Sequence, residues 1–147
     1  MRQRQLPLTQ IDNRRARSRI GEEWVEAHLP EYTRDQDVRR AMAKRLGVEL
    51  QSLDLVKRDG RGILDIKTSI LELGGWNAYS VGENSAPERA LAQGLSAEYI
   101  ELYMDRQGKV LEVSRILTHA EVISRVVKPH LRVSAKVDLT GVPRIYP

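Results

Sequence analysis

The spacing of apolar residues changes near Val48, from three- and four-residue steps before it to alternation after it. Steps of three and four place apolar side chains on one face of a helix. The pattern predicts a first helix over residues 13–29, with Asp12 as N-cap and Pro30 as its stop. It predicts a second helix over residues 36–46. We expect both helices to pack their apolar faces against the rest of the fold.

The alternation after Val48 predicts two paired strands, at residues 52–58 and 62–69. Asp59-Gly60 lies between them, and an Asp-Gly pair between two apolar runs is a strong hairpin signal. The side chains of these two strands are therefore expected to meet across a short turn.

The second half of the chain repeats both kinds of pattern. Two segments begin with Ser or Thr followed three residues later by Glu, which is the capping-box signature of a helix N-terminus. They predict helices from Ser85 to about residue 93 and from Thr118 to about residue 127. Strands are predicted at residues 76–81, 98–104 and 109–116, and residues 131–147 are predicted to form a last strand or an arm.

This order of elements predicts an α+β fold in which helices flank one central mixed sheet. The chain has 147 residues, and no internal repeat or Pro/Gly-rich linker divides it. We therefore expect a single domain over residues 1–147.

Composition excludes several classes of site. The chain has no cysteine, so it has no disulfide, zinc finger or thiol nucleophile, and its three histidines are too far apart for a local metal motif. Any metal would be bound by oxygen. Five tyrosines, two tryptophans and no phenylalanine argue against a protein that stacks single-stranded bases on exposed rings. No apolar run reaches the ~18 residues of a membrane span, so we expect no membrane association and a cytoplasmic location.

Charge is concentrated at the two ends. Residues 1–19 carry a net +5 and residues 122–147 a net +4, and because the whole chain carries +4, the residues between carry −5. Basic ends around an acidic centre suit a protein that binds a polyanion near a carboxylate cluster, although solvated basic tails are the alternative. The candidate nucleic-acid contacts lie in basic arms over residues 1–19 and 128–147, and they are Arg15, Arg19, Lys128, Arg132 and Lys136.

The predicted hairpin carries the residues with the clearest chemistry. Asp65 and Lys67 are two apart on a strand, so both side chains leave the same face, about 7 Å apart. Asp54 on the paired strand adds a second carboxylate. Two carboxylates and a main-chain carbonyl form a hard oxygen site suited to Mg²⁺, and a nearby lysine can orient a metal-bound water. The alternative is a solvated strand face with Asp54 at a turn.

This arrangement resembles the PD-(D/E)XK phosphodiesterase superfamily, which includes restriction endonucleases, archaeal Holliday-junction resolvases and Mrr-like nucleases. Its core motif is an Asp followed ten to twenty residues later by (Asp/Glu)-x-Lys on the next strand. Here ten residues separate Asp54 from Asp65-Ile66-Lys67. Members often place an acid on the first helix, as Gly21-Glu22-Glu23 would. The resemblance covers residues 20–122 and departs from the motif at Leu53, where the family has Pro.

The resemblance implies a restriction-endonuclease-like fold and a Mg²⁺-dependent DNA endonuclease, with Mn²⁺ able to substitute and a homodimer as the working unit. By that resemblance Asp54, Asp65 and the carbonyl of Ile66 would hold Mg²⁺. Lys67 would position the attacking water, and Glu22, chosen over Glu23, would complete the acidic shell. Two alternatives stay open: a noncatalytic nucleic-acid-binding module of the same fold, and a toxin-type nuclease that acts on tRNA.

Overall fold

The computed structural model describes residues 14–73, 77–82, 84–129 and 134–145. Within these residues no helix combines the length and the apolar character needed to cross a membrane. The helices are α1 (Arg14–His28), α2 (Gln36–Leu46), α3 (Ala86–Ala92) and α4 (His119–Ser124). The strands are β1 (Tyr32–Thr33), β2 (Leu55–Lys57), β3 (Gly62–Ile70), β4 (Asn77–Ser80), β5 (Ser96–Met104), β6 (Val110–Ser114), β7 (Leu117–Thr118), β8 (Val126–Pro129), β9 (Ser134–Val137) and β10 (Arg144–Ile145).

The main sheet has the order β1-β2-β3-β5-β6-β10, with β7 also paired to β5. Its centre is a parallel pair, β3 and β5, in register from Gly62 opposite Ser96 to Ile70 opposite Met104. The other pairs in this sheet are antiparallel. The prediction of an α+β fold with a mixed central sheet flanked by helices is confirmed.

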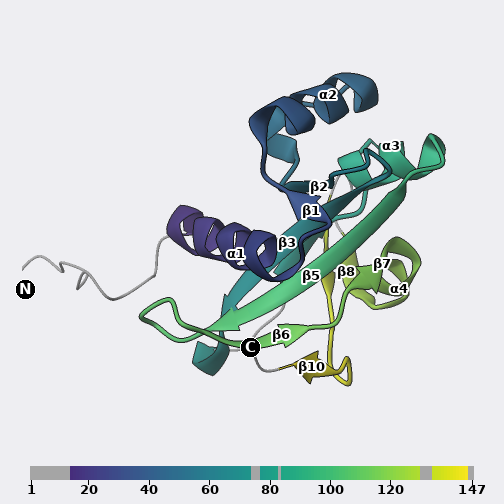
Figure 1. The fold of residues 1–147 in the computed structure, drawn as a ribbon. Coiled ribbons are helices and arrows are strands. Elements are labelled where there is room, and N and C mark those ends of the chain that lie inside the picture. Colours follow the sequence, from purple (N-terminus) through teal and green to yellow (C-terminus); the bar gives the residue numbers. More distant parts are fainter. Residues whose placement is uncertain (1–13, 74–76, 83, 130–133, 146–147) are drawn as a thin grey trace, which may run out of the picture.

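Helix α1 covers one face of this sheet and lies across it in Figure 1. Val25 of α1 is fully buried and packs in a cluster with Leu64, Ile66 and Leu102 of β3 and β5. The helix approaches closely because Gly21 faces β3, where an added Cβ would lie 2.9 Å from Cγ2 of Thr68. Gly21 therefore sets both the distance and the rotation of α1 on the sheet.

The opposite face has two coverings. At one end α2 and α3 pack on Ile63 and Ala97 of the sheet. At the other end Tyr99 of β5 packs against Tyr79, Val122 and a second sheet of order β4-β9-β8. Asp65 and Lys67 project from β3 on this same side, because they alternate with Ile66 and lie two and four residues beyond Ile63.

Two predictions about the C-terminal half need correction. The capping box of Thr118 and Glu121 forms as predicted, but α4 ends at Ser124, and the following residues form β8 instead of a helix to about residue 127. The predicted strand near residues 76–81 forms as β4, but it pairs with β9 outside the main sheet. Within residues 128–147, positions 128–129, 134–137 and 144–145 thus lie in strands; Arg132 lies outside the described residues.

Replacing Gly21 with valine tests the close packing of α1 on β3. The new side chain would overlap Thr68 and Ile66, so we expect the free energy of unfolding to fall by about 1–3 kcal/mol, measured by chemical denaturation. Ala27→Val, at an exposed position of the same helix, controls for helix propensity and should cost less than about 0.7 kcal/mol. Equal losses in both variants would contradict the packing described.

Candidate functional site

The turn between β2 and β3 fixes which residues face each other. Gly60 adopts a left-handed φ of 74°, and Asp59 Oδ1 accepts the N–H of Arg61 at 2.9 Å. The strands then pair with Leu55 opposite Leu64. Continuing this antiparallel register by one residue brings Asp54 opposite Asp65, so the short turn sets the spacing of the two carboxylates.

Asp65 and Lys67 share one face of β3, as predicted from their spacing. Lys67 Nζ lies 3.3 Å from Asp65 Oδ2, and both side chains are mostly buried. The ring of Tyr79 from β4 lies beneath the ammonium, 5.7 Å from Nζ to the ring centroid, within the range of a cation–π contact. A lysine held between a carboxylate and a ring has a defined position.

Asp54 is held at the start of β2 by the backbone of β3. Its Oδ2 accepts the N–H of Ile66 at 2.8 Å. Burial raises the pKa of Asp54 well above its usual range, and the neighbouring Asp65 carboxylate raises this pKa further, while the Ile66 N–H and the Lys67 ammonium oppose the rise. Two acids forced together in this way favour a proton or a cation between them.

Lys67 remains positively charged in this site. Burial acts to lower its pKa, but the carboxylates of Asp65 and Asp54 more than offset that effect, so the pKa of Lys67 is raised above that of a free lysine. At neutral pH the side chain is therefore an ammonium, which donates hydrogen bonds and does not accept a proton.

Leu53, the residue before Asp54, is fixed by packing and by a backbone hydrogen bond. Leu53 is buried against α2 and α3, and its N–H donates to the carbonyl of Leu50 at 3.1 Å to close a 3₁₀ turn at Leu50–Ser52. Proline has no N–H and could not make this bond. Leucine thus positions Asp54 through packing and a backbone hydrogen bond.

Asp54, Asp65 and Lys67 line one cavity of about 450 Å³. Its walls come from the first turns of α1, the residues before β2, the middle of β3, strand β4 and the start of α3. The charged residues among its described lining are Arg14, Arg17, Asp54, Asp65 and Lys67.

A deeper polar network supports the floor of the site. Glu101 of β5 is 4% exposed and lies opposite Lys67 in the parallel register. Its carboxylate accepts hydrogen bonds from Tyr79 Oη at 2.7 Å and from Ser69 Oγ and Asn77 Nδ2 at 2.5 Å. Glu101 and Asn77 were not predicted from the sequence, because their meeting depends on the parallel register of β3 and β5 and on where β4 packs, which no local pattern encodes.

The oxygen atoms of this site suit a Mg²⁺ ion that is held by few protein ligands. Asp65 Oδ2 is buried and accepts no hydrogen bond within the described residues, although it pairs with Lys67. The N–H and C=O of one strand residue point to the same edge, so the Ile66 carbonyl faces the Asp54 side, beyond the last pair of β2. The described residues contain no cluster of three or more His, Cys, Asp or Glu suited to a metal, so the fit rests on two carboxylates and a carbonyl.

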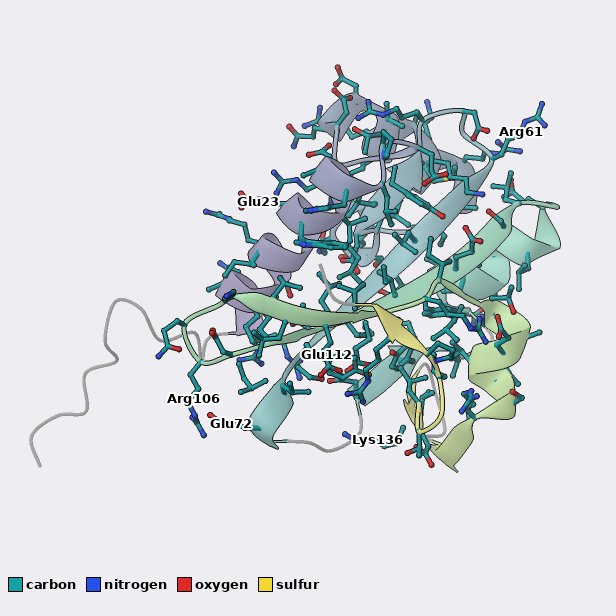
Figure 2. All side chains as sticks on the ribbon, turned by 60° about the horizontal axis from the view of Figure 1, so that its bottom comes forward. Glu23, Arg61, Glu72, Arg106, Glu112 and Lys136 are labelled. Carbon is teal, nitrogen blue, oxygen red and sulfur yellow. The ribbon has the colours of Figure 1, made fainter. Side chains whose placement is uncertain are left out.

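Glu22 lies outside this cavity. It lines a separate groove with Glu26, Arg34 and Arg39, and its Oε1 lies 3.9 Å from Arg34 Nη1. Burial raises the pKa of Glu22, and the nearby Arg34 and Arg39 only partly oppose this. Glu23 projects outward from α1 in Figure 2, is 56% exposed and does not line the cavity either. The expected third acid is therefore not brought together with Asp54 and Asp65 in this conformation.

Four of the basic residues predicted to contact nucleic acid are described by the structure, and they lie on α1, β8 and β9. Arg15 and Arg19 are exposed on α1 but do not line the cavity, whereas Arg14 and Arg17 of the same helix do. Lys136 lies on β9, far from the turn that carries Arg61 (Figure 2), and Lys128 lies on β8. Contacts by Arg15, Arg19, Lys128, Arg132 and Lys136 remain predictions.

Comparison with family models, with curated protein sequences and with solved structures finds no match to this chain. Its function is therefore inferred from the geometry of the Asp54, Asp65 and Lys67 site.

Replacing Asp54 with asparagine tests the electrostatic conflict between the two acids. The pKa of Asp54 is raised in the fold above its ordinary 3.8, so the folded state holds a proton that the unfolded state releases. Stability in EDTA should therefore fall as pH rises from 3.8 through the raised pKa, and the variant should lack this loss. We expect Asp54→Asn to have a higher melting temperature than the wild type at pH 7, where 1 kcal/mol corresponds to roughly 4 °C. Below pH 3.8 the two proteins should have the same melting temperature.

The control for this measurement is Asp59→Asn. Asp59 is an exposed acid in the turn of the same hairpin, and asparagine preserves its hydrogen bond to the Arg61 N–H. Its melting temperature should follow that of the wild type at every pH. A lower melting temperature for Asp54→Asn at pH 7 would mean that Asp54 is a structural ion-pair partner instead of a strained acid.

Proposed function

We propose that this protein is a Mg²⁺-dependent endonuclease that hydrolyses phosphodiester bonds of DNA, built on a restriction-endonuclease-like fold of the PD-(D/E)XK superfamily. The observation that supports this most is the convergence of Asp54, Asp65 and Lys67 on one cavity from the two strands of a hairpin. A solvated strand face would leave these groups exposed, but they are mostly buried, and their neighbours raise the pKa values of Asp54 and Lys67.

Each group has a distinct role in the proposed reaction. Asp54, Asp65 and the Ile66 carbonyl would hold Mg²⁺, with Mn²⁺ able to replace it. A bound ion would supply Lewis-acid polarisation of the phosphodiester and would lower the pKa of a nearby water. Lys67, as an ammonium, donates hydrogen bonds that orient the attacking water and the phosphate oxygens. Water adds its oxygen to phosphorus, the P–O ester bond breaks, and the products are a phosphate monoester and a hydroxyl.

Two common covalent nucleophiles, cysteine and an accessible tyrosine hydroxyl, are not offered by the described site. No cysteine exists in the chain, and the hydroxyl of Tyr79 is buried and donates to Glu101. A nucleophile needs an adjacent base and access to the phosphate. Direct attack by water is therefore the mechanism proposed.

We further propose a homodimer as the working unit on duplex DNA. One hairpin site per chain addresses one strand, so two chains are needed to cut both strands in one encounter. A monomer in solution that nicks plasmid without linearising it would contradict this part of the proposal.

Cleavage of supercoiled plasmid and of tRNA, each with Mg²⁺ and with EDTA, tests the reaction and its substrate. We expect plasmid to be nicked or linearised with Mg²⁺ and left intact in EDTA. Cleavage of tRNA alone would indicate the toxin-type alternative. Metal-independent binding of DNA without cleavage of either substrate would indicate the noncatalytic module.

Two substitutions test the assignment of the site. Asp65→Asn removes a proposed metal ligand and Lys67→Ala removes the ammonium, and each should slow plasmid cleavage at least about a hundredfold. Lys57→Ala is the matched control, because Lys57 lies on the partner strand, pairs with Glu98 at 3.4 Å and does not line the cavity. All three variants should melt cooperatively. Full activity of purified Asp65→Asn or Lys67→Ala would refute the assignment.

A further inference from the structure

The cavity is also lined by an arginine, Arg14, that has no role in the proposed reaction. Arg14 is the first residue of α1, is exposed, and lines the cavity together with Asp65 and Lys67. Arg14 and Lys67 are therefore two cations that line the same cavity.

Most arginines of the described chain already have a protein partner. Several bind a carboxylate: Arg34 pairs with three glutamates of α1, Arg115 with Glu121 and Arg144 with Glu112. Others donate to main-chain carbonyls, as Arg39 and Arg89 do. Within the described residues Arg14 has no hydrogen bond or ion pair to another side chain, so its guanidinium is available for a ligand.

The charge balance of the cavity indicates what that ligand is. Arg14, Arg17 and Lys67 outnumber Asp54 and Asp65 by one positive charge among the described lining residues. A divalent cation held by the two acids would raise this excess by two more charges. A cavity of that charge attracts an anion. A guanidinium presents a planar fork of N–H donors that matches two oxygens of one phosphate.

We propose that Arg14 binds a non-bridging oxygen of the backbone phosphate at the cleavage position, from the side of the cavity opposite Lys67. This inference rests on the proposed nuclease function and adds a substrate contact to it. Arg14 would clamp the phosphate between α1 and β3, so that the water oriented by Lys67 meets a fixed phosphorus atom.

The experiment compares Arg14→Ala with Arg61→Ala. Both substitutions remove one positive charge from an exposed arginine, but Arg61 projects from the tip of the β2–β3 turn and does not line the cavity (Figure 2). A general electrostatic effect would change both variants equally, whereas a phosphate contact inside the cavity is specific to Arg14.

Two readouts are measured on the full chain. In plasmid cleavage with Mg²⁺, we expect kcat/KM to fall at least about tenfold for Arg14→Ala and to stay within about twofold for Arg61→Ala. In binding of a fluorescent DNA duplex in Ca²⁺, which keeps the substrate intact, Arg14→Ala should reduce the slope of log affinity against log salt by about 0.9. Arg14→Lys should recover part of the activity, because it restores the charge without the planar fork.

The outcomes separate this inference from the proposed function. A wild-type chain that cleaves plasmid while both alanine variants behave alike would overturn the role of Arg14 and leave the nuclease function standing. A wild-type chain that cleaves neither plasmid nor tRNA would overturn the proposed function and the Arg14 contact with it. A tenfold loss restricted to Arg14→Ala, partly recovered by lysine, supports both.

Discussion

The parallel pairing of β3 with β5 is the constraint on which the site depends. Parallel neighbours cannot be joined by a tight turn, so the chain must leave the end of β3 and return to the beginning of β5 by a long connection. That connection contains β4 and α3, and Asn77, Ser80 and Pro87 from it form a wall of the cavity. The antiparallel hairpin of β2 and β3 supplies the opposite side with Asp54. The cavity therefore forms because β3 pairs antiparallel with β2 on one side and parallel with β5 on the other.

Burying polar side chains in the middle of such a sheet carries a large desolvation cost, and hydrogen bonds from neighbouring side chains offset it. Glu101 is almost fully buried, and a buried carboxylate without donors would cost several kcal/mol. It is stabilised by hydrogen bonds from Tyr79, Ser69 and Asn77. Because Tyr79 also lies under Lys67, the network that satisfies Glu101 also fixes the floor on which the ammonium rests.

Local signals in the sequence predict local structure well in this protein. In the structure Asp35 caps the start of α2, Gly47 ends it in the left-handed conformation, and the predicted capping box of α4 forms, because each of these depends on residues within one helical turn. The shared face of Asp65 and Lys67 follows from strand geometry alone. Ser85 caps α3, but Glu88 turns away from the cap to pair with His119.

The parts that could not be predicted depend on residues that are distant in sequence. The pairing of β4 with β9 joins Asn77 to Val137, and no local periodicity specifies that choice. Helix α4 ends at Ser124 because the residues from Val126 onward are extended and pair with β9 as strand β8. The network around Glu101 and the separation of Glu22 from the two aspartates both arise from tertiary packing, which overrides the local pattern.

The rotation of α1 decides which of its charged residues reach the site. Successive helical residues are about 100° apart, so Gly21 facing β3 brings Arg14 and Arg17 to within about 40° of the same direction, whereas Glu22 is turned by about 100°. This explains why the arginines line the cavity and Glu22 faces Arg34. A third acid is not required for the proposed metal. Two carboxylates and a main-chain carbonyl would suffice to hold Mg²⁺, because this ion usually binds few protein ligands.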